Sequence, residues 1–237
     1  MTDLTRNVYI GIDTGGSSGA FAILQRASFV RTRVSLHPMP KTEEELAKLI
    51  NVFHFNFRQL EAHWCIESNS AFHRGGPGSI YQNSARSSVS LASNAAFIRG
   101  VIKGLRYPLE TVGPKVWQKW LQAQPGAIPV PEPPPKPAMK MPRKKDFKNT
   151  NDPEGLFREQ FNEFCRLTDE YRPFLAAWSK EKKKIFADNA LMLSGDYHLT
   201  TPKAFRSGNI VMSWGYGDAL AIALWLRSTV EQENDEK

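Results

Sequence analysis

Three short apolar runs begin the chain, each too brief for a helix and each bounded by small or polar residues. The first, at 8–13, ends on an acid, and a Gly/Ser turn leads into the second run, at 19–24. A polar turn then precedes the third run, at 29–36. Short apolar runs separated by turn residues are typical of buried strands. The pattern therefore predicts an antiparallel meander of three strands.

The next segment carries a helix signal. Thr42 is a capping residue, Glu45 stands three positions later to close a capping box, and apolar residues recur from Leu46 at helical spacing. The remaining predicted elements are a strand at 63–67, a helix at 84–104, a strand at 109–112, a helix at 114–121, helical stretches at 154–167 and 179–193, and a last helix at 217–229. This order predicts an α/β fold, in which a mixed five-stranded sheet (antiparallel meander plus parallel strands) is flanked by helices.

The composition changes abruptly after the helix at 114–121. Residues 125–142 include eight prolines, and residues 136–148 include six Lys or Arg against one acid. Such a stretch is typical of an exposed, polyproline-like basic excursion that packs no core. We therefore expect a core formed by 1–122 and 178–230, an insertion at 123–177, and an acidic tail at 231–237.

The charge balance indicates a polyanionic partner. The 237 residues carry a formal net charge of +7, although the last seven residues are acidic. Two cysteines far apart, with no Cys/His cluster, exclude a disulfide scaffold and a structural zinc site. No apolar run reaches the roughly 20 residues that a bilayer requires, and the polar N-terminus is unlike a secretory signal. We expect a cytoplasmic protein with no membrane partner.

Three acidic residues lie at positions where a carboxylate is unfavourable unless it has a specific role. Asp13 ends the first strand, Glu67 ends the fourth, and Asp218 lies at the start of the apolar last helix. Taken singly, Asp13 could satisfy turn amides, Glu67 could pair with a surface arginine, and Asp218 could cap its helix. Together, at one end of one sheet, the three carboxylates would repel one another and favour a bound cation. Mg²⁺ or Mn²⁺ suits oxygen ligands of this kind. Two such ions would activate water against a phosphodiester, and a basic protein with an acidic metal pocket is typical of a nuclease.

Several cationic and aromatic residues are candidates for contacts with DNA. Lys180 and Lys184 lie one helical turn apart, so one of them could stabilise charge at the scissile phosphate, although a solvated basic face is an equal interpretation. In the glycine-rich loop after Glu67, Phe72 could stack on an unpaired base and Arg74 could meet a phosphate. The other predicted DNA-binding residues are Arg86, Lys140, Arg143, Lys144 and Lys145.

Three motifs resemble those of RuvC-type Holliday junction resolvases, in the family's order and at compatible spacing: Ile10-Gly-Ile-Asp-Thr-Gly-Gly-Ser-Ser-Gly19, Cys65-Ile-Glu-Ser68 and Gly217-Asp-Ala-Leu-Ala-Ile-Ala223. The resemblance spans 7–122 and 178–227 and leaves 123–177 as a lineage-specific insertion, consistent with a phage or viral branch. It implies an RNase H-like fold and a homodimer that nicks four-way DNA symmetrically. Asp13 would bridge two divalent ions, with Glu67 holding one and Asp218 the other.

One departure from the family and one second resemblance keep other functions open. Bacterial resolvases carry a fourth acid three residues before the last aspartate, and that position is Gly215 here. A catalytically weak DNA-binding protein of recombination is therefore one alternative. The run from Gly11 to Ser17 also resembles the first phosphate loop of actin-like sugar kinases, whose core is RNase H-like too. A kinase of that kind, however, normally needs two such domains.

Overall fold

The computed structural model describes residues 7–15, 19–26, 32–68, 85–194, 198–200 and 210–235. These residues form two compact units. The first contains the described residues up to 68, then 85–129, then 183 to 235, and the second contains 130–182.

A mixed sheet is the centre of the first unit. Its strands are β1 (Asn7–Asp13), β2 (Ala20–Arg26), β3 (Thr32–Pro38), β4 (Glu61–Glu67), β5 (Leu109–Val112) and β6 (His198–Thr200), in the order β5-β4-β1-β2-β3-β6. β1, β2 and β3 form an antiparallel meander, whereas β4 runs parallel to β1 and β5 parallel to β4. The predicted fold class is confirmed: five mixed strands flanked by helices in the RNase H-like arrangement. β6, which pairs in parallel with β3, extends the sheet and was not predicted, because three residues are too few to show an alternating pattern.

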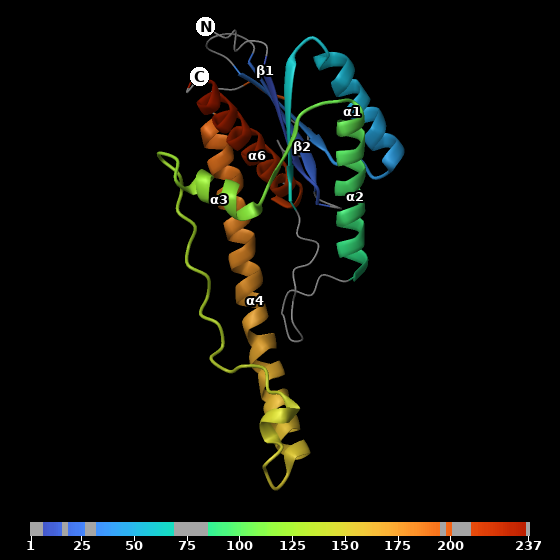
Figure 1. The fold of residues 1–237 in the computed structure, drawn as a ribbon. Coiled ribbons are helices and arrows are strands. Elements are labelled where there is room, and N and C mark those ends of the chain that lie inside the picture. Colours follow the sequence, from blue (N-terminus) through green and yellow to red (C-terminus); the bar gives the residue numbers. More distant parts are fainter. Residues whose placement is uncertain are drawn as a thin grey trace. The chain divides into compact units, whose positions relative to one another are not determined.

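One face of the sheet is covered by α1 (Glu43–Phe57) and α2 (Ala85–Gly104), as Figure 1 shows. Alternate strand residues on this face are buried in one hydrophobic cluster with residues of the two helices. The strand residues include Val8, Ile10, Ile12, Trp64 and Ile66, and the helix residues include Ile50, Ile98 and Ile102. The start of α1 follows its predicted cap, since Thr42 Oγ1 accepts the amide hydrogen of Glu45 at 3.2 Å. The Glu45 carboxylate, however, accepts from the amide of Lys41 rather than that of Thr42, so the predicted box closes one residue early.

The opposite face is covered by α6 (Ile210–Asp235), with α3 (Pro114–Gln122) beside it. α6 approaches β1 closely because Gly11 has no side chain. A Cβ on Gly11 would clash with the backbone of Ala219 and would lie 2.9 Å from the Ala223 Cβ. Farther toward its N-terminus, α6 packs by Gly217 against Ala187 of α4 (Pro153–Ser194), where a Cβ would lie 2.6 Å from the Ala187 Cβ. Two glycines thus set the distance of α6 from the sheet and from α4.

The loop after α3 stays with the first unit through one buried side chain. Asn189 of α4 is fully buried, and its amide forms a two-way clamp with the backbone of Ile128. The Ile128 amide donates to Asn189 Oδ1 at 2.7 Å, and Asn189 Nδ2 donates to the Ile128 carbonyl at 3.0 Å. These two bonds anchor residues that the sequence assigned to the insertion.

The second unit is a proline-rich segment packed along a helix. Residues 130–142, here called the proline strap, have no helix or strand. Their carbonyls accept hydrogen bonds from α4: Trp178 Nε1 donates to Pro131 at 2.9 Å, and the Tyr171 hydroxyl donates to Pro134 at 2.9 Å. The sequence did not predict these contacts, which form because a polyproline-like backbone keeps its carbonyls available to aromatic donors.

α4 is a single helix of 42 residues, where two helical stretches, at 154–167 and 179–193, were predicted. Pro173 lies inside it and is exposed, while Tyr171 and Leu175 on either side of it are buried. A proline within a helix removes one backbone hydrogen bond, and α4 nevertheless continues past this residue. Among the described residues, no helix is long and apolar enough to cross a membrane.

We predict that Gly11→Ala destabilises the protein by about 1–3 kcal/mol, because the added methyl group would push α6 away from β1. Gly100→Ala is the matched control, since Gly100 lies on the exposed side of α2 with nothing within 4 Å of its would-be Cβ. That change should leave stability equal or raise it by up to about 1 kcal/mol. Urea unfolding followed by circular dichroism measures both, and equal stability of the two variants would contradict the close packing.

We also predict that the first unit folds without the second. The Trp178–Pro131 hydrogen bond holds the two ends of residues 132–177 near each other, so a short Gly/Ser linker can replace them. The deletion variant should keep one cooperative thermal transition. Its Tm should fall by about 2–4 °C for each 1 kcal/mol of stability that is lost. Loss of the cooperative transition would show that the two units fold only together.

Candidate active site

The candidate site starts from the parallel pairing of β1 and β4. Ile12 pairs with Ile66, so the next residues, Asp13 and Glu67, end the two strands side by side. Successive side chains of a strand alternate between its faces. Since Ile12 and Ile66 point to α1 and α2, Asp13 and Glu67 point to the face that α6 and α3 cover. The side chains are 7% and 8% exposed, so two carboxylates are buried next to each other.

Each carboxylate accepts a hydrogen bond from a described residue that orients it. The amide of Gly15 donates to Asp13 Oδ1 at 3.0 Å, within the turn that follows β1. Trp117 Nε1 donates to Glu67 Oε1 at 3.0 Å. Trp117 is fully buried in α3 and meets Phe186 of α4 edge to face, with 5.7 Å between the ring centroids. The packing of α3 against α4 therefore fixes the Glu67 side chain.

Burial makes both acids hard to ionise. Desolvation raises the pKa of Asp13 to about 6, against the opposing effects of the Gly15 amide and the charge of Lys183. Desolvation, together with the Asp13 charge, raises the pKa of Glu67 to about 7, against the Trp117 hydrogen bond and Lys183. Two desolvated carboxylates that repel each other are the donor set that a divalent cation would stabilise. The pair thus fits a hard metal ion.

Lys183 is the cation of the site, and the sequence did not single it out. It is exposed on α4, and its charge lowers the pKa of both Asp13 and Glu67. The position follows from the helix: Lys183 precedes Phe186 and Ala187, which pack on Trp117 and Gly217, by about one turn. The signal that could have identified it is this pair of apolar residues, which marks the face of α4 turned toward the sheet.

The predicted lysines have other surroundings. Lys180 and Lys184 are both exposed, and Lys180 belongs to the second unit. Neither contributes to the pKa of Asp13 or Glu67. Their catalytic role stays a prediction.

Asp218 lies on the same face of the sheet but is not gathered into one cluster with the other two acids. It directly precedes Ala219, which packs over Gly11 of β1, and its side chain is half-buried. In the part of the chain that the structure describes, no group of three or more His, Cys, Asp or Glu side chains is placed to hold one metal ion. The structure therefore brings Asp13 and Glu67 together and leaves Asp218 nearby, while position 215 is a buried glycine of α6.

The predicted DNA-binding residues are dispersed. Phe72 and Arg74 lie outside the described residues, and Arg86 belongs to α2 with an undescribed side chain. Lys140, Lys144 and Lys145 are exposed in the second unit. Arg143 caps the short 3₁₀ helix η2 (Lys144–Phe147), and its guanidinium binds the Asp146 carboxylate through two bonds of 3.1 and 3.2 Å. The charge of Arg143 is thus partly neutralised within its own turn.

Comparison with known proteins adds one solved structure. No family model matches the chain, and no curated protein matches it. A structure described as "Thermus thermophilus RuvC structure" is similar over 94% of this chain and 96% of that chain, at 12% sequence identity and a TM-score of 0.44. At this level of identity and superposition the likeness carries no argument about function, and the inferences below depend on the residues themselves.

We predict that removing one buried charge stabilises the metal-free protein. At pH 8 in EDTA, Asp13→Asn should raise the free energy of unfolding by about 1–3 kcal/mol, because the native state no longer pays for a desolvated carboxylate beside Glu67. Asparagine still accepts the Gly15 amide hydrogen. Glu159→Gln, an exposed acid of α4, is the control and should change stability by less than about 0.5 kcal/mol. Destabilisation by Asp13→Asn would contradict the inference that the two buried carboxylates repel each other.

Proposed function

We propose that this protein is a metal-dependent endonuclease of branched DNA that resolves four-way (Holliday) junctions by paired nicks. The observation that supports it best is the pair of buried carboxylates, Asp13 and Glu67, at the ends of parallel strands, with the charge of Lys183 acting on both. A metal-dependent phosphodiesterase requires oxygen ligands for the cation and a nearby positive charge for the phosphate. The RNase H-like fold and the basic composition agree with this assignment.

Each residue of the site would have a distinct role. Asp13 and Glu67 would hold Mg²⁺ or Mn²⁺, two ions with Asp218 included, as the resemblance in the three motifs implies. Bound there, the metal supplies an activated water and stabilises the leaving oxygen of the phosphodiester. The Gly15 amide and Trp117 keep the two carboxylates in place, so little rearrangement is needed on binding. Lys183 would stabilise the charge that develops on the phosphate.

A homodimer would place two such sites for two symmetric cuts, since two-fold symmetry in the DNA is matched most simply by a two-fold protein. The kinase alternative fits less well: it needs a second RNase H-like domain, and the second unit, as far as the structure describes it, consists of the proline strap, η2 and part of α4. The DNA-binding accessory alternative remains motivated by Gly215, and the experiment below separates it from a nuclease.

We predict that the purified protein cuts a synthetic four-way junction with paired nicks in Mg²⁺, and leaves a linear duplex of the same sequence intact. EDTA or Asp13→Asn should abolish cleavage. Lys183→Met should slow it about 10²–10³-fold, the effect of removing one group that stabilises transition-state charge. Gel assays of both strands at single turnover measure the rates.

The matched control is Lys48→Met, an exposed lysine of α1 on the opposite face of the sheet, which should stay within about twofold of the wild type. No cleavage of any branched DNA in Mg²⁺ or Mn²⁺ would refute the nuclease. Tight junction binding without cleavage would instead support the accessory protein, and ATP hydrolysis without DNA would support the kinase.

A further inference from the structure

The second unit contains a pocket that the nuclease site does not use. It lies between η2 and the first turns of α4 and has a volume of about 350 Å³. Its walls include two phenylalanines and three cations: Phe157, Phe161, Lys144, Lys148 and Arg158. We call it the Phe157 pocket. Its size is at the lower end of ligand pockets in proteins and suits one nucleobase with part of its sugar.

The aromatic wall is built and supported. Phe157 and Phe161, one helical turn apart on α4, are stacked with 5.7 Å between their centroids and 23° between their planes. Phe147 of η2 is buried and meets Phe157 edge to face at 6.1 Å, which holds the Phe157 ring in place from behind. Phe157 and Phe161 are only half-buried, so the supported rings remain accessible to a ligand. A flat, fixed aromatic surface of this kind is what a planar base stacks on.

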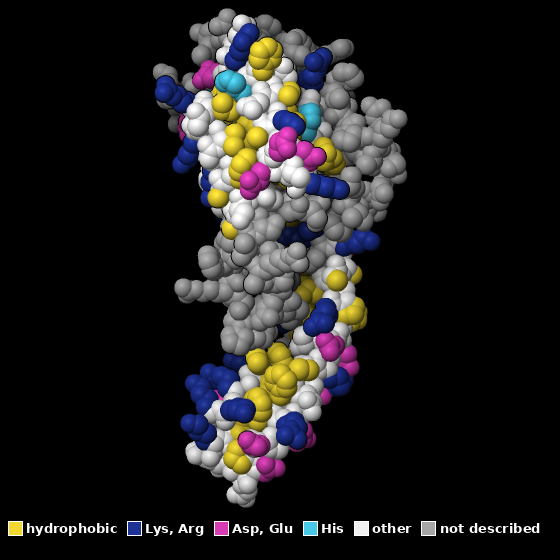
Figure 2. All heavy atoms as spheres, turned by 90° about the vertical axis from the view of Figure 1, so that its right-hand side faces the viewer, with side chains coloured by type: hydrophobic (Ala, Val, Ile, Leu, Met, Phe, Trp, Pro, Cys, Tyr) yellow, Lys and Arg dark blue, Asp and Glu magenta, His cyan; other side chains and the backbone are white. Residues whose placement is uncertain are grey.

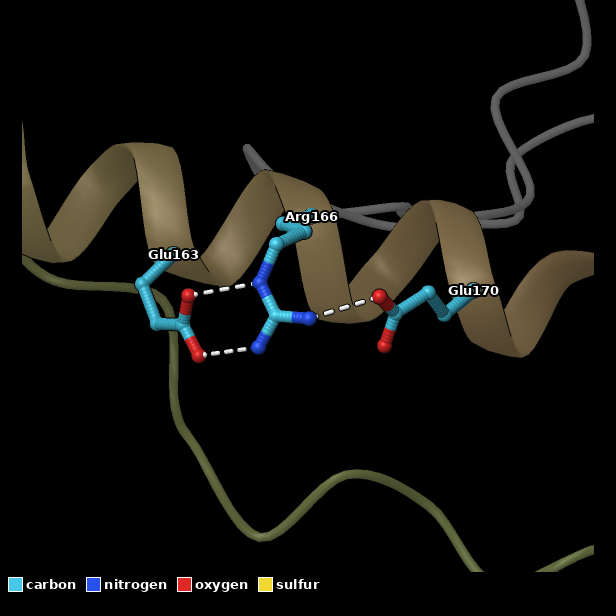
Figure 3. A network of polar contacts seen from close by, with 3 residues as sticks. All are labelled: Glu163, Arg166 and Glu170. Atoms are coloured by element: carbon cyan, nitrogen blue, oxygen red, sulfur yellow. Dashed lines mark hydrogen bonds and ion pairs between the residues drawn. The ribbon is translucent and has the colours of Figure 1, made fainter.

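The cations of the pocket differ from two arginines in the same unit, each of which has a carboxylate partner. Arg166, one turn or two farther along α4, is bound by Glu163 on one side and Glu170 on the other, as Figure 3 shows. Arg143 is bound by Asp146. In contrast, no described carboxylate forms an ion pair with Lys144, Lys148 or Arg158.

Lys144 Nζ lies 5.8 Å from the centroid of the Phe157 ring, and one acid, Glu154, lines the pocket. The pocket therefore offers a net positive charge beside an aromatic face. Figure 2 shows hydrophobic side chains beside Lys and Arg on the visible surface of this unit, with Asp and Glu among them.

We propose that the Phe157 pocket binds single-stranded DNA, with one unpaired base stacked on Phe157 and the flanking phosphates at Lys144, Lys148 and Arg158. The charge complementarity selects a polyanion, and the exposed ring pair selects one with planar groups. An acidic peptide would satisfy only the cations. The choice of DNA rests on the proposed function, because strands next to a branch point offer unpaired nucleotides. The experiment is chosen so that the two can fail separately.

The test measures binding of a fluorescent oligothymidylate of about 12 nucleotides to the full-length protein in EDTA, by anisotropy. Phe157→Ala should weaken binding about 5- to 150-fold, the range expected for one stacked base. Phe157→Trp, which keeps an aromatic ring at this position, should bind the oligonucleotide like the wild type. Phe174→Ala, which removes an exposed ring of α4 outside the pocket, should stay within about twofold of the wild type.

The salt dependence separates stacking from charge. Arg158→Gln should reduce the slope of log K against log salt by about 0.7, the value for one phosphate contact on a single strand. Arg172→Gln, whose side chain pairs with Asp169, should leave the slope unchanged, and so should Phe157→Ala despite its weaker binding. If Phe157→Ala does not fold, the Arg158→Gln slope and photocrosslinking of 5-iodouracil to the wild-type pocket decide the question.

Three results would overturn the proposal: equal losses from Phe157→Ala and Phe174→Ala, an Arg158→Gln slope equal to that of the wild type, or displacement of the oligonucleotide by a poly-glutamate peptide as efficiently as by unlabelled DNA. The last result would indicate a site for acidic protein segments. Junction cleavage that persists in a protein lacking Phe157-dependent binding refutes this site alone. Phe157-dependent binding in a protein that cuts no junction refutes only the nuclease.

Discussion

The close contact between α6 and β1 at Gly11 is the constraint on which the first unit depends. With any side chain at that position, the backbone at Ala219 and Ala223 could not reach the strand. The same contact determines where Asp218 lies, because it is the residue just before Ala219. Gly217 then brings α4 onto α6 at Ala187, one turn from Lys183. Two glycines thus place the acid of the last helix and the lysine of α4 on the sheet face where Asp13 and Glu67 end their strands.

The electrostatics at the ends of β1 and β4 oppose folding and favour the binding of a cation. Asp13 and Glu67 are buried beside each other, and both pKa values are raised by desolvation. Among the described residues, the Gly15 amide at Asp13, the Trp117 side chain at Glu67 and the charge of Lys183 oppose this effect. A site of this type stores unfavourable energy that a cation can relieve, as expected where stability has been given up for function. In the second unit, one stretch of α4 shows the reverse pattern, because Arg166 is paired with both Glu163 and Glu170.

Local signals predicted most of the secondary structure. The Thr42 cap, the short apolar runs and the spacing from Leu46 indicated the first strands and α1 correctly, because each depends on residues close in sequence. The prediction of two helices in place of α4 was wrong because the apolar periodicity lapses between 167 and 179, and the burial of Tyr171 and Leu175 in that interval is not visible in the sequence. The hydrogen bonds between the proline strap and α4 were not predicted for a similar reason, since the donors Tyr171 and Trp178 lie about 40 residues farther along.

For the candidate site, the residue types and the strand ends are evident in the sequence, because an acid that closes a short apolar run is conspicuous there. The proximity of the two acids, in contrast, is not evident in the sequence. That Asp13 and Glu67 lie side by side follows from the parallel register of β1 and β4, which is set by the core under Ile12 and Ile66. The choice of Lys183 among four clustered basic residues depends on the rotation of α4, and that rotation is fixed by the packing of Phe186 on Trp117 and Ala187 on Gly217. Chemistry is carried by single residues and can be read from them, whereas proximity arises from contacts between segments distant in sequence.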